Sequence, residues 1–128
     1  DSLDTYSAFA ARVEQSRESL RVLLGSLQGE GARLVGYAAS SKGTVILNYC
    51  GIGPDSLECV CDNIPSKEGL FTPGTHIPVV SIDRFAADYP DYAFLLAWNH
   101  LNEISIKEHV FREHGGRFIT HIPMARII

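Results

Sequence analysis

Hydrophobic and polar positions follow two rhythms along this chain, one typical of amphipathic helices and one of buried strands. Apolar residues recur every three or four positions from residue 3 to about 28, with charged residues on the other face, which predicts one long helix. Short apolar runs predict five strands, at 33–37, 57–61, 79–80, 92–97 and 117–121. Helical spacing returns between these strands, at 44–50, 82–89 and 101–114.

This alternation of strands and helices determines the fold class that we expect. Strands that alternate with helices form a parallel sheet covered on both faces, and right-handed crossovers make such a fold Rossmann-like. We therefore predict an α/β fold, a Rossmann-like three-layer domain with a mainly parallel sheet, preceded by a long N-terminal helix. Residues 1–30 are interpreted as a linking amphipathic helix and residues 31–128 as the Rossmann-like domain.

Composition and charge exclude several classes of function. No apolar run approaches the roughly 18–20 residues that span a bilayer, so we expect no transmembrane helix and no membrane partner. The N-terminus lacks the basic and apolar regions of a signal peptide. A formal net charge of −4 argues against a nucleic-acid surface but leaves room for small anions.

The cysteines and histidines predict neither a disulfide framework nor a metal site. Cys50, Cys59 and Cys61 are odd in number and lack CxxC spacing, so we expect buried, reduced thiols and a cytoplasmic protein. His109 and Glu113 lie four apart on a predicted helix and could supply two metal ligands at most. No Ser–His–Asp, Cys–His or paired-carboxylate pattern is recognisable, so we name no catalytic residue.

Candidate binding residues follow from the fold. In a doubly wound sheet, ligands bind at the carboxyl ends of the strands, near the switch in strand order. That rule selects four segments, at 37–43, 62–67, 71–76 and 98–100, and because all four follow strands or lie in the loop between them, they can meet in space.

The first of these segments is a turn of small residues with one cation, leading into a helix. It lacks the second glycine of a dinucleotide fingerprint, because Gly36 is followed by Ala38, and it does not match a Walker A loop. Backbone N–H groups, hydroxyls and a lysine near a helix N-terminus can hold a phosphate or diphosphate. A plain turn with a solvated lysine remains the alternative. The candidate residues are Tyr37, Ala38, Ser40, Ser41, Lys42 and Gly43.

The other three segments each allow a binding role and a structural role. Asp62 follows the second strand, where dinucleotide folds place an acid on the ribose, but such residues also cap turns. The loop at 63–78 is long and rich in breakers, which is typical of functional loops. Trp98 is as compatible with a core position as with a ligand contact. The further candidates are Lys67, Pro73, Gly74, Thr75, His76, Trp98 and Asn99.

Five motifs in order carry a family resemblance: Gly36–Gly43, Leu47–Ile52, Asp62–Lys67, Pro73–Pro78, and Trp98-Asn99 with Glu103-Ile104. Over residues 33 to 123 the chain resembles the C-terminal domain of the S-adenosylmethionine-dependent sugar C-methyltransferases. The resemblance implies a nucleotide-linked keto-deoxysugar as ligand, with a dTDP-type sugar suspected. It also implies that S-adenosylmethionine and the main catalytic histidine belong to a separate methyltransferase domain, which would be a partner of this one, so this chain binds no cofactor itself.

The same resemblance implies how the candidate residues share the ligand. Lys42 and the 38–43 backbone would hold the diphosphate, and Asp62 or Lys67 the nucleoside. Thr75 and His76, with Trp98 and Asn99, would approach the sugar. Two alternatives remain open, a stand-alone nucleotide- or dinucleotide-binding Rossmann domain and a purely structural domain that shapes the methyltransferase cleft.

Overall fold

The computed structural model describes residues 2–38, 41–62, 69–96, 101–120 and 126–128, and within them leaves out the side chains of 2–14, 16, 41–45 and 126. Its elements run in this order: α1 (Ser2–Gly29), β1 (Leu34–Tyr37), α2 (Ser41–Cys50), β2 (Val60–Asp62), β3 (Val79–Ser81), α3 (Asp83–Ala87), β4 (Tyr92–Leu95), α4 (Leu101–Lys107), α5 (His109–Glu113), β5 (Arg117–Thr120) and β6 (Arg126–Ile127).

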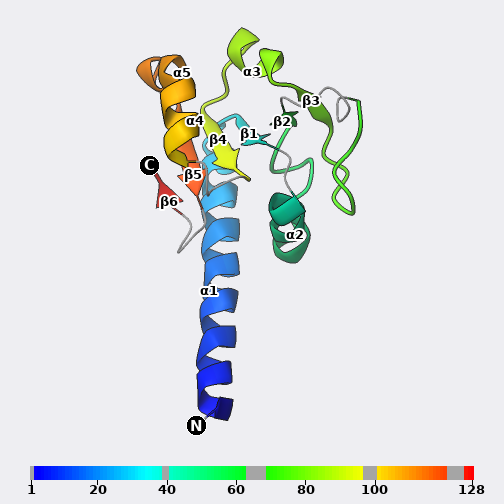
Figure 1. Cartoon of the computed structure of the whole chain (residues 1–128), viewed down its shortest axis with the longest axis vertical. Coiled ribbons are helices and arrows are strands. Elements are labelled where there is room, and N and C mark those ends of the chain that lie inside the picture. The colour runs from blue at the N-terminus through cyan, green and yellow to red at the C-terminus, as the bar shows by residue number, and fades with distance from the viewer. Residues whose placement is uncertain (1, 39–40, 63–68, 97–100, 121–125) are drawn as a thin grey trace.

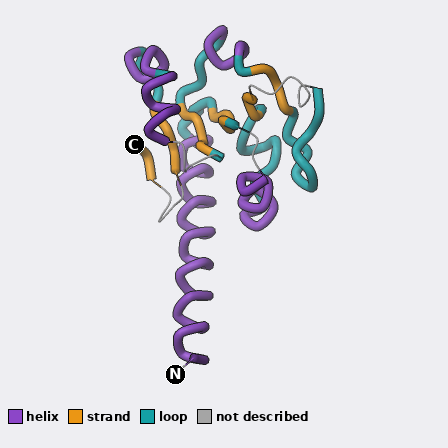
Figure 2. Tube along the Cα trace, viewed as in Figure 1, coloured by secondary structure: helices purple, strands orange, loops and turns teal. Residues whose placement is uncertain are grey.

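The described strands form one sheet in the order β3-β2-β1-β4-β5-β6. The first five strands are parallel to one another, and β6 runs antiparallel to β5. Helices lie on both sides of the strand layer (Figure 2). The order 3-2-1-4-5 is that of a doubly wound fold, with its switch point between β1 and β4, where the strand order reverses. The predicted α/β, Rossmann-like class is therefore confirmed.

Helix α1 confirms the predicted long N-terminal helix and has two halves with different surroundings. In the second half, Leu20, Leu24 and Leu27 are buried at helical spacing, and the Arg17 guanidinium lies 5.5 Å from the ring centre of Tyr49 on α2. The first half extends well beyond the sheet (Figure 1). The second half of α1 is thus part of the domain's own core, whereas a linking role for the helix stays a prediction.

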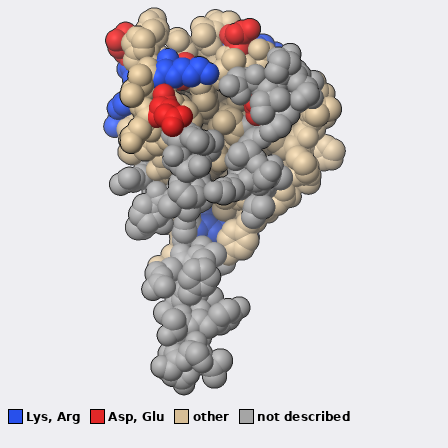
Figure 3. Space-filling model, viewed as in Figure 1, with Lys and Arg blue, Asp and Glu red and all other residues tan. Residues whose placement is uncertain are grey.

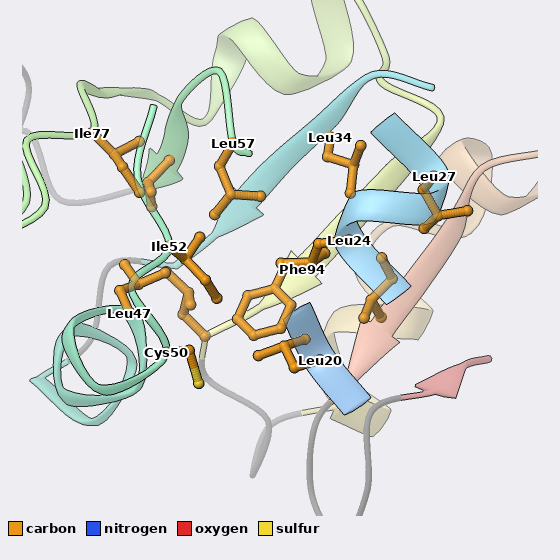
Figure 4. Close-up of a cluster of buried hydrophobic side chains, with 13 residues drawn as sticks. Leu20, Leu24, Leu27, Leu34, Leu47, Cys50, Ile52, Leu57, Ile77 and Phe94 are labelled. Carbon is orange, nitrogen blue, oxygen red and sulfur yellow. The ribbon is translucent and has the colours of Figure 1, made fainter. Parts of the chain in front are cut away.

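Two hydrophobic clusters cover the two faces of the sheet. The aliphatic core, between the sheet and helices α1 and α2, packs leucine and isoleucine side chains around Phe94 (Figure 4). The aromatic core lies on the other face and includes Phe85, Phe111 and Phe118 from α3, α5 and β5. Neighbouring rings in it stand about 5 Å apart, in the edge-on or tilted arrangements that aromatic pairs favour.

Several elements differ from the prediction in ways that have local causes. The helix expected over 101–114 is two helices, because Glu108 leaves the helical conformation with φ −102° and ψ 35°. Helix α2 begins at Ser41, so Ser41, Lys42 and Gly43 form its first turn and not the loop before it. Strand β6 was not predicted, since two residues show no periodicity.

Cys50 and Cys61 are buried and Cys59 is half-buried, and all three are free thiols. Among the described helices, none is both long and apolar enough to cross a membrane. Within the same residues, no group of three or more His, Cys, Asp or Glu side chains is placed to hold a metal ion.

Candidate functional site

The candidate site begins where β1 ends, at the switch point of the sheet. Ala38 has φ 69°, the left-handed conformation that an alanine adopts at a cost of about 1–2 kcal/mol. Hydrogen bonds hold this turn from both sides. The Ala38 N–H donates to the Cys61 carbonyl at 2.7 Å, and the Tyr37 carbonyl accepts from the Leu96 N–H at 3.1 Å. The neighbouring strands therefore determine the direction in which the chain leaves β1.

Helix α2 starts three residues after Ala38. Its first N–H groups, around Ser41, Lys42 and Gly43, have no acceptor within the helix, and the helix dipole adds partial positive charge there. Gly36 plays a different part, because a Cβ atom on it would lie 3.0 Å from Val60 Cγ2. That glycine permits close packing inside the sheet, and the site is formed by the residues after it.

Asp62 ends β2 at the same edge of the sheet. Asp62 is 4% exposed, and its backbone carbonyl accepts a hydrogen bond from the Ile82 N–H at 2.9 Å. The carboxyl edge of the sheet thus brings together Tyr37, Ala38, the start of α2 and Asp62. Ser40, Lys67, Trp98 and Asn99 lie outside the described residues, as does the side chain of Lys42.

The Tyr37 side chain points away from the turn into the aromatic core. Its hydroxyl donates to Glu108 Oε2 at 2.5 Å, and its ring meets Phe85 edge-on at 5.2 Å. Burial and the bond to Glu108 raise the pKa of Tyr37 well above its ordinary value. At the neighbouring position on β2, a hydrogen bond with Cys59 and burial raise the pKa of the Cys61 thiol.

Glu108 was missed at the level of the sequence. It is 8% exposed, and Ile104 and Phe111, four residues before it and three after it, are also buried. A glutamate at that spacing stands on the apolar face of the helix pattern. This position was the available signal, because a carboxylate on a buried face needs a partner.

The loop before β3 corrects one prediction. Residues 71–78 form a short hairpin closed by an antiparallel bridge between Phe71 and Pro78, and the Pro78 carbonyl accepts from the N–H of Val60, the first residue of β2. The hairpin therefore joins the amino edge of the sheet. Parallel strands of three or four residues separate the two edges by about 10–13 Å. The expectation that all four candidate segments meet at one place is wrong for this segment.

The hairpin is held in a defined shape. The buried Thr72 hydroxyl contacts the Thr75 hydroxyl at 2.5 Å and accepts from the Ile77 N–H at 2.9 Å. On α2, the Asn48 side-chain amide donates to the Pro73 carbonyl at 2.9 Å, and Gly74, with φ 79°, passes close beside Asn48. These contacts form near the last turn of α2, at the end of the helix remote from Ser41.

His76 is exposed on this hairpin. Its φ is 57°, and its ring centre lies 6.1 Å from that of Phe71, which is also exposed. The strained backbone is compensated by the hydrogen bond from the His76 N–H to the Thr72 carbonyl. Pro73, Gly74, Thr75 and His76 are thus brought together with one another but not with the carboxyl edge.

Charge on the surface shows no large area of one sign in the view of Figure 3. The described acidic and basic side chains stand close to one another over the part of that face formed by α3 and the α4–α5 pair. A broad basic surface, as nucleic acids require, is absent from the described part of this face.

Comparison with known proteins identifies the family. Residues 1–123 match the family described as the C-methyltransferase C-terminal domain. The chain belongs to this family. The matched residues include α1 as well as the sheet from β1 to β5, so the family's domain comprises the long helix together with the parallel part of the sheet.

A curated relative gives the scale of the similarity. The C-methyltransferase NovU of Streptomyces niveus is 40% identical over 123 residues, which are 96% of this chain and 29% of that protein. The chain therefore spans less than a third of the length of this C-methyltransferase.

Proposed function

We propose that this domain binds the nucleotide sugar in an S-adenosylmethionine-dependent sugar C-methyltransferase, which methylates a carbon beside the keto group of a nucleotide-linked deoxysugar. The observation that carries the proposal is the left-handed turn at Ala38, directly before the N-terminus of α2 at the switch point of the sheet. Family membership supplies the type of reaction. The domain is incomplete as a catalyst by itself, and its free thiols fit a cytoplasmic setting.

In this proposal, different residues at the carboxyl edge contact different parts of the nucleotide sugar. The backbone at 38–43 and Lys42 hold the diphosphate, because N–H groups at a helix N-terminus favour anions. Asp62 or Lys67 contacts the nucleoside, which we take to be of the dTDP type. Trp98 and Asn99 follow β4 and contact the sugar. The hairpin residues Pro73 to His76 belong to the ligand site only if the ligand or the partner domain extends to the amino edge.

The methyl donor is assigned to the partner domain. A glycine-rich turn lets a cofactor approach the backbone closely. Here Gly36 lies inside β1 and packs against Val60, and the turn that follows the strand begins with Ala38, which has a side chain. The described residues therefore do not fit S-adenosylmethionine, which would supply the methyl group from elsewhere in the complete enzyme.

A titration of the isotope-labelled 128-residue chain with thymidine diphosphate tests the proposal. We expect saturable changes in the amide NMR signals of residues 37–43 and around Asp62, larger than those caused by inorganic phosphate. Changes at Gly74 to His76 in the same titration would add the hairpin to the site. Unchanged signals at 37–43 would contradict the proposal.

A dinucleotide site is the second candidate, because Asp62 ends β2 where dinucleotide folds place the acid that contacts the ribose. The same titration with NADH separates the two, since tighter binding of NADH than of thymidine diphosphate would favour this candidate. A purely structural domain is tested in the complete enzyme, where it predicts that Lys42→Ala leaves KM for the sugar unchanged.

A further inference from the structure

Glu108 places a carboxyl group against the aromatic core, where it meets the Tyr37 side chain. Glu108 is 8% exposed and occupies the interruption between α4 and α5. Taking a carboxylate out of water is unfavourable unless hydrogen bonds compensate for the lost solvation. Its position therefore calls for a structural or functional reason.

The partner of this carboxylate is a hydroxyl 71 residues away in the sequence. Tyr37 is 4% exposed, and its hydroxyl reaches Glu108 Oε2 at 2.5 Å. The edge-on contact with Phe85 restricts the ring from the side. This bond holds the end of the tyrosine side chain, and the ring contact holds its side.

The residue so held is the last one of β1 and directly precedes Ala38. The Tyr37 carbonyl accepts a hydrogen bond from the N–H of Leu96, the residue after β4. The Ala38 N–H donates a hydrogen bond to the carbonyl of Cys61 in β2. The bond to Glu108 adds a restraint on the third side. Ala38 then adopts a conformation that alanine avoids in the absence of such restraints.

We propose that Glu108 is a positioning residue, which acts through the Tyr37 hydroxyl to keep Ala38 in its left-handed conformation and the N-terminus of α2 aimed at the ligand. The consequence for binding rests on the proposed function. The effect on the backbone of Ala38 does not, because it can be measured without any ligand.

Four variants of the 128-residue chain test this role. Tyr37→Phe removes the hydroxyl, Glu108→Ala removes the acceptor, and Glu108→Gln keeps an oxygen of similar geometry. Ile52→Val is the matched control, because it removes one methyl group from the aliphatic core on the other face of the sheet. Each is examined for the NMR scalar coupling and carbon shifts of Ala38, which report φ, for unfolding in urea, and for Kd of thymidine diphosphate.

We expect Tyr37→Phe and Glu108→Ala to shift the Ala38 signals away from the left-handed range and to raise Kd about tenfold, the factor that corresponds to one such backbone rearrangement. Glu108→Gln should return the Ala38 signals to the left-handed range. It should also bring Kd of thymidine diphosphate to within about threefold of the value for the original chain. Ile52→Val should lower stability and leave both unchanged. If Glu108→Ala does not fold, Tyr37→Phe carries the test.

One result would contradict the positioning role of Glu108, and another would contradict the proposed function alone. If Tyr37→Phe lowers stability but leaves the Ala38 signals and Kd unchanged, the pair only stabilises the core and the positioning role is wrong. If the original chain does not bind thymidine diphosphate, the proposed function fails, while the Ala38 signals still decide whether Glu108 sets the backbone.

Discussion

Around Arg33, at the amino edge of the sheet, exposed polar groups satisfy one another, whereas around Ala38, at the carboxyl edge, buried polar groups surround a strained backbone. Arg33 pairs with Glu58 at 2.5 Å and Asp88 at 3.0 Å, and its N–H donates to Asp91 at 2.7 Å. The carboxyl edge instead has the left-handed Ala38, the buried Asp62 and the buried Thr120 hydroxyl, which finds no hydrogen-bond partner among the residues that the structure describes.

The same short strands therefore serve a stabilising purpose at one edge and a binding purpose at the other. Contacts among exposed groups at the amino edge stabilise the domain and leave little for a ligand. Unfavourable conformations persist at functional positions only when surrounding contacts compensate for them. We therefore expect amino-edge variants to change stability alone, and carboxyl-edge variants to change ligand binding as well.

The largest effect is expected at the amino edge, from Gly116→Ala. A Cβ atom on Gly116 would lie 2.1 Å from Cε1 of the fully buried Phe111, so the aromatic core must shift. We expect a loss of about 3 kcal/mol in the free energy of unfolding, measured in urea. Gly115→Ala is the control, since open space surrounds Gly115 and only its φ of 91° is unfavourable. Equal losses for the two variants would contradict the packing explanation.

Gly74→Ala should have the next largest effect. Its Cβ atom would lie 2.2 Å from Asn48 Oδ1, in a backbone with φ 79°, so the hairpin must loosen from α2. We expect a loss of about 2 kcal/mol with unchanged binding of thymidine diphosphate. Gly53→Ala is the control, because its Cβ atom meets only the Thr75 carbonyl at 3.7 Å. Weakened binding in Gly74→Ala would bring the hairpin into the ligand site.

At the carboxyl edge, the raised pKa of Tyr37 predicts a loss of stability in alkali. Below pH 10 the hydroxyl is protonated in both the folded and the unfolded chain, and its contribution is complete. Above pH 10 the unfolded chain releases this proton while the folded chain keeps it, so stability falls as pH rises. At pH 11 the loss is about 1.4 kcal/mol. Urea unfolding from pH 8 to 11 should show a steeper fall than in Tyr37→Phe, and parallel curves would refute the prediction.

Ala38→Gly should stabilise the fold. Glycine adopts φ near 69° without steric cost, although the unfolded chain gains freedom, so we expect a net gain of about 1 kcal/mol. Urea unfolding measures this gain, and Ala93→Gly in the adjacent strand β4 provides a control that must destabilise. A loss of stability in Ala38→Gly would show that the turn is not strained by its alanine.

The smallest effect is expected from Arg33→Met. Arg33 is 41% exposed on its side chain, and ion pairs at such positions are weakened by solvent, so we expect a loss of about 0.5 kcal/mol. Salt should reduce the difference between the variant and the original chain. A loss above about 2 kcal/mol would mean that the amino edge depends on this arginine far more than its exposure implies.

The order of elements could be predicted because periodicity reports which residues are buried. Residues such as Leu20, Leu24 and Leu27 repeat at the helical period, and the run at 92–95 is apolar on both faces. The interruption at Glu108 could not be predicted from local pattern, since it coincides with a hydrogen bond to a tyrosine 71 positions earlier.

The candidate site was predictable only in part. The strand-end rule located Ala38 and Asp62, because both directly follow or end a parallel strand. It misplaced Thr75 and His76, since a loop between two parallel strands runs from one edge of the sheet to the other and sequence does not say where its polar residues stop. Asn48 holds the hairpin at the amino edge through its hydrogen bond to Pro73. A contact between segments so far apart in the sequence cannot be predicted from the pattern of either segment alone.

The outer strands of the sheet have a consequence for self-association. Strand β6 has two residues and β3 has three, and Val79 of β3 is already bonded on its outer side to Gly69 and Leu70. Unpaired backbone groups along a long outer strand are what a second sheet needs for edge-to-edge growth. The described part of this sheet therefore presents little to template a β-aggregate, although its interior strands are apolar and buried.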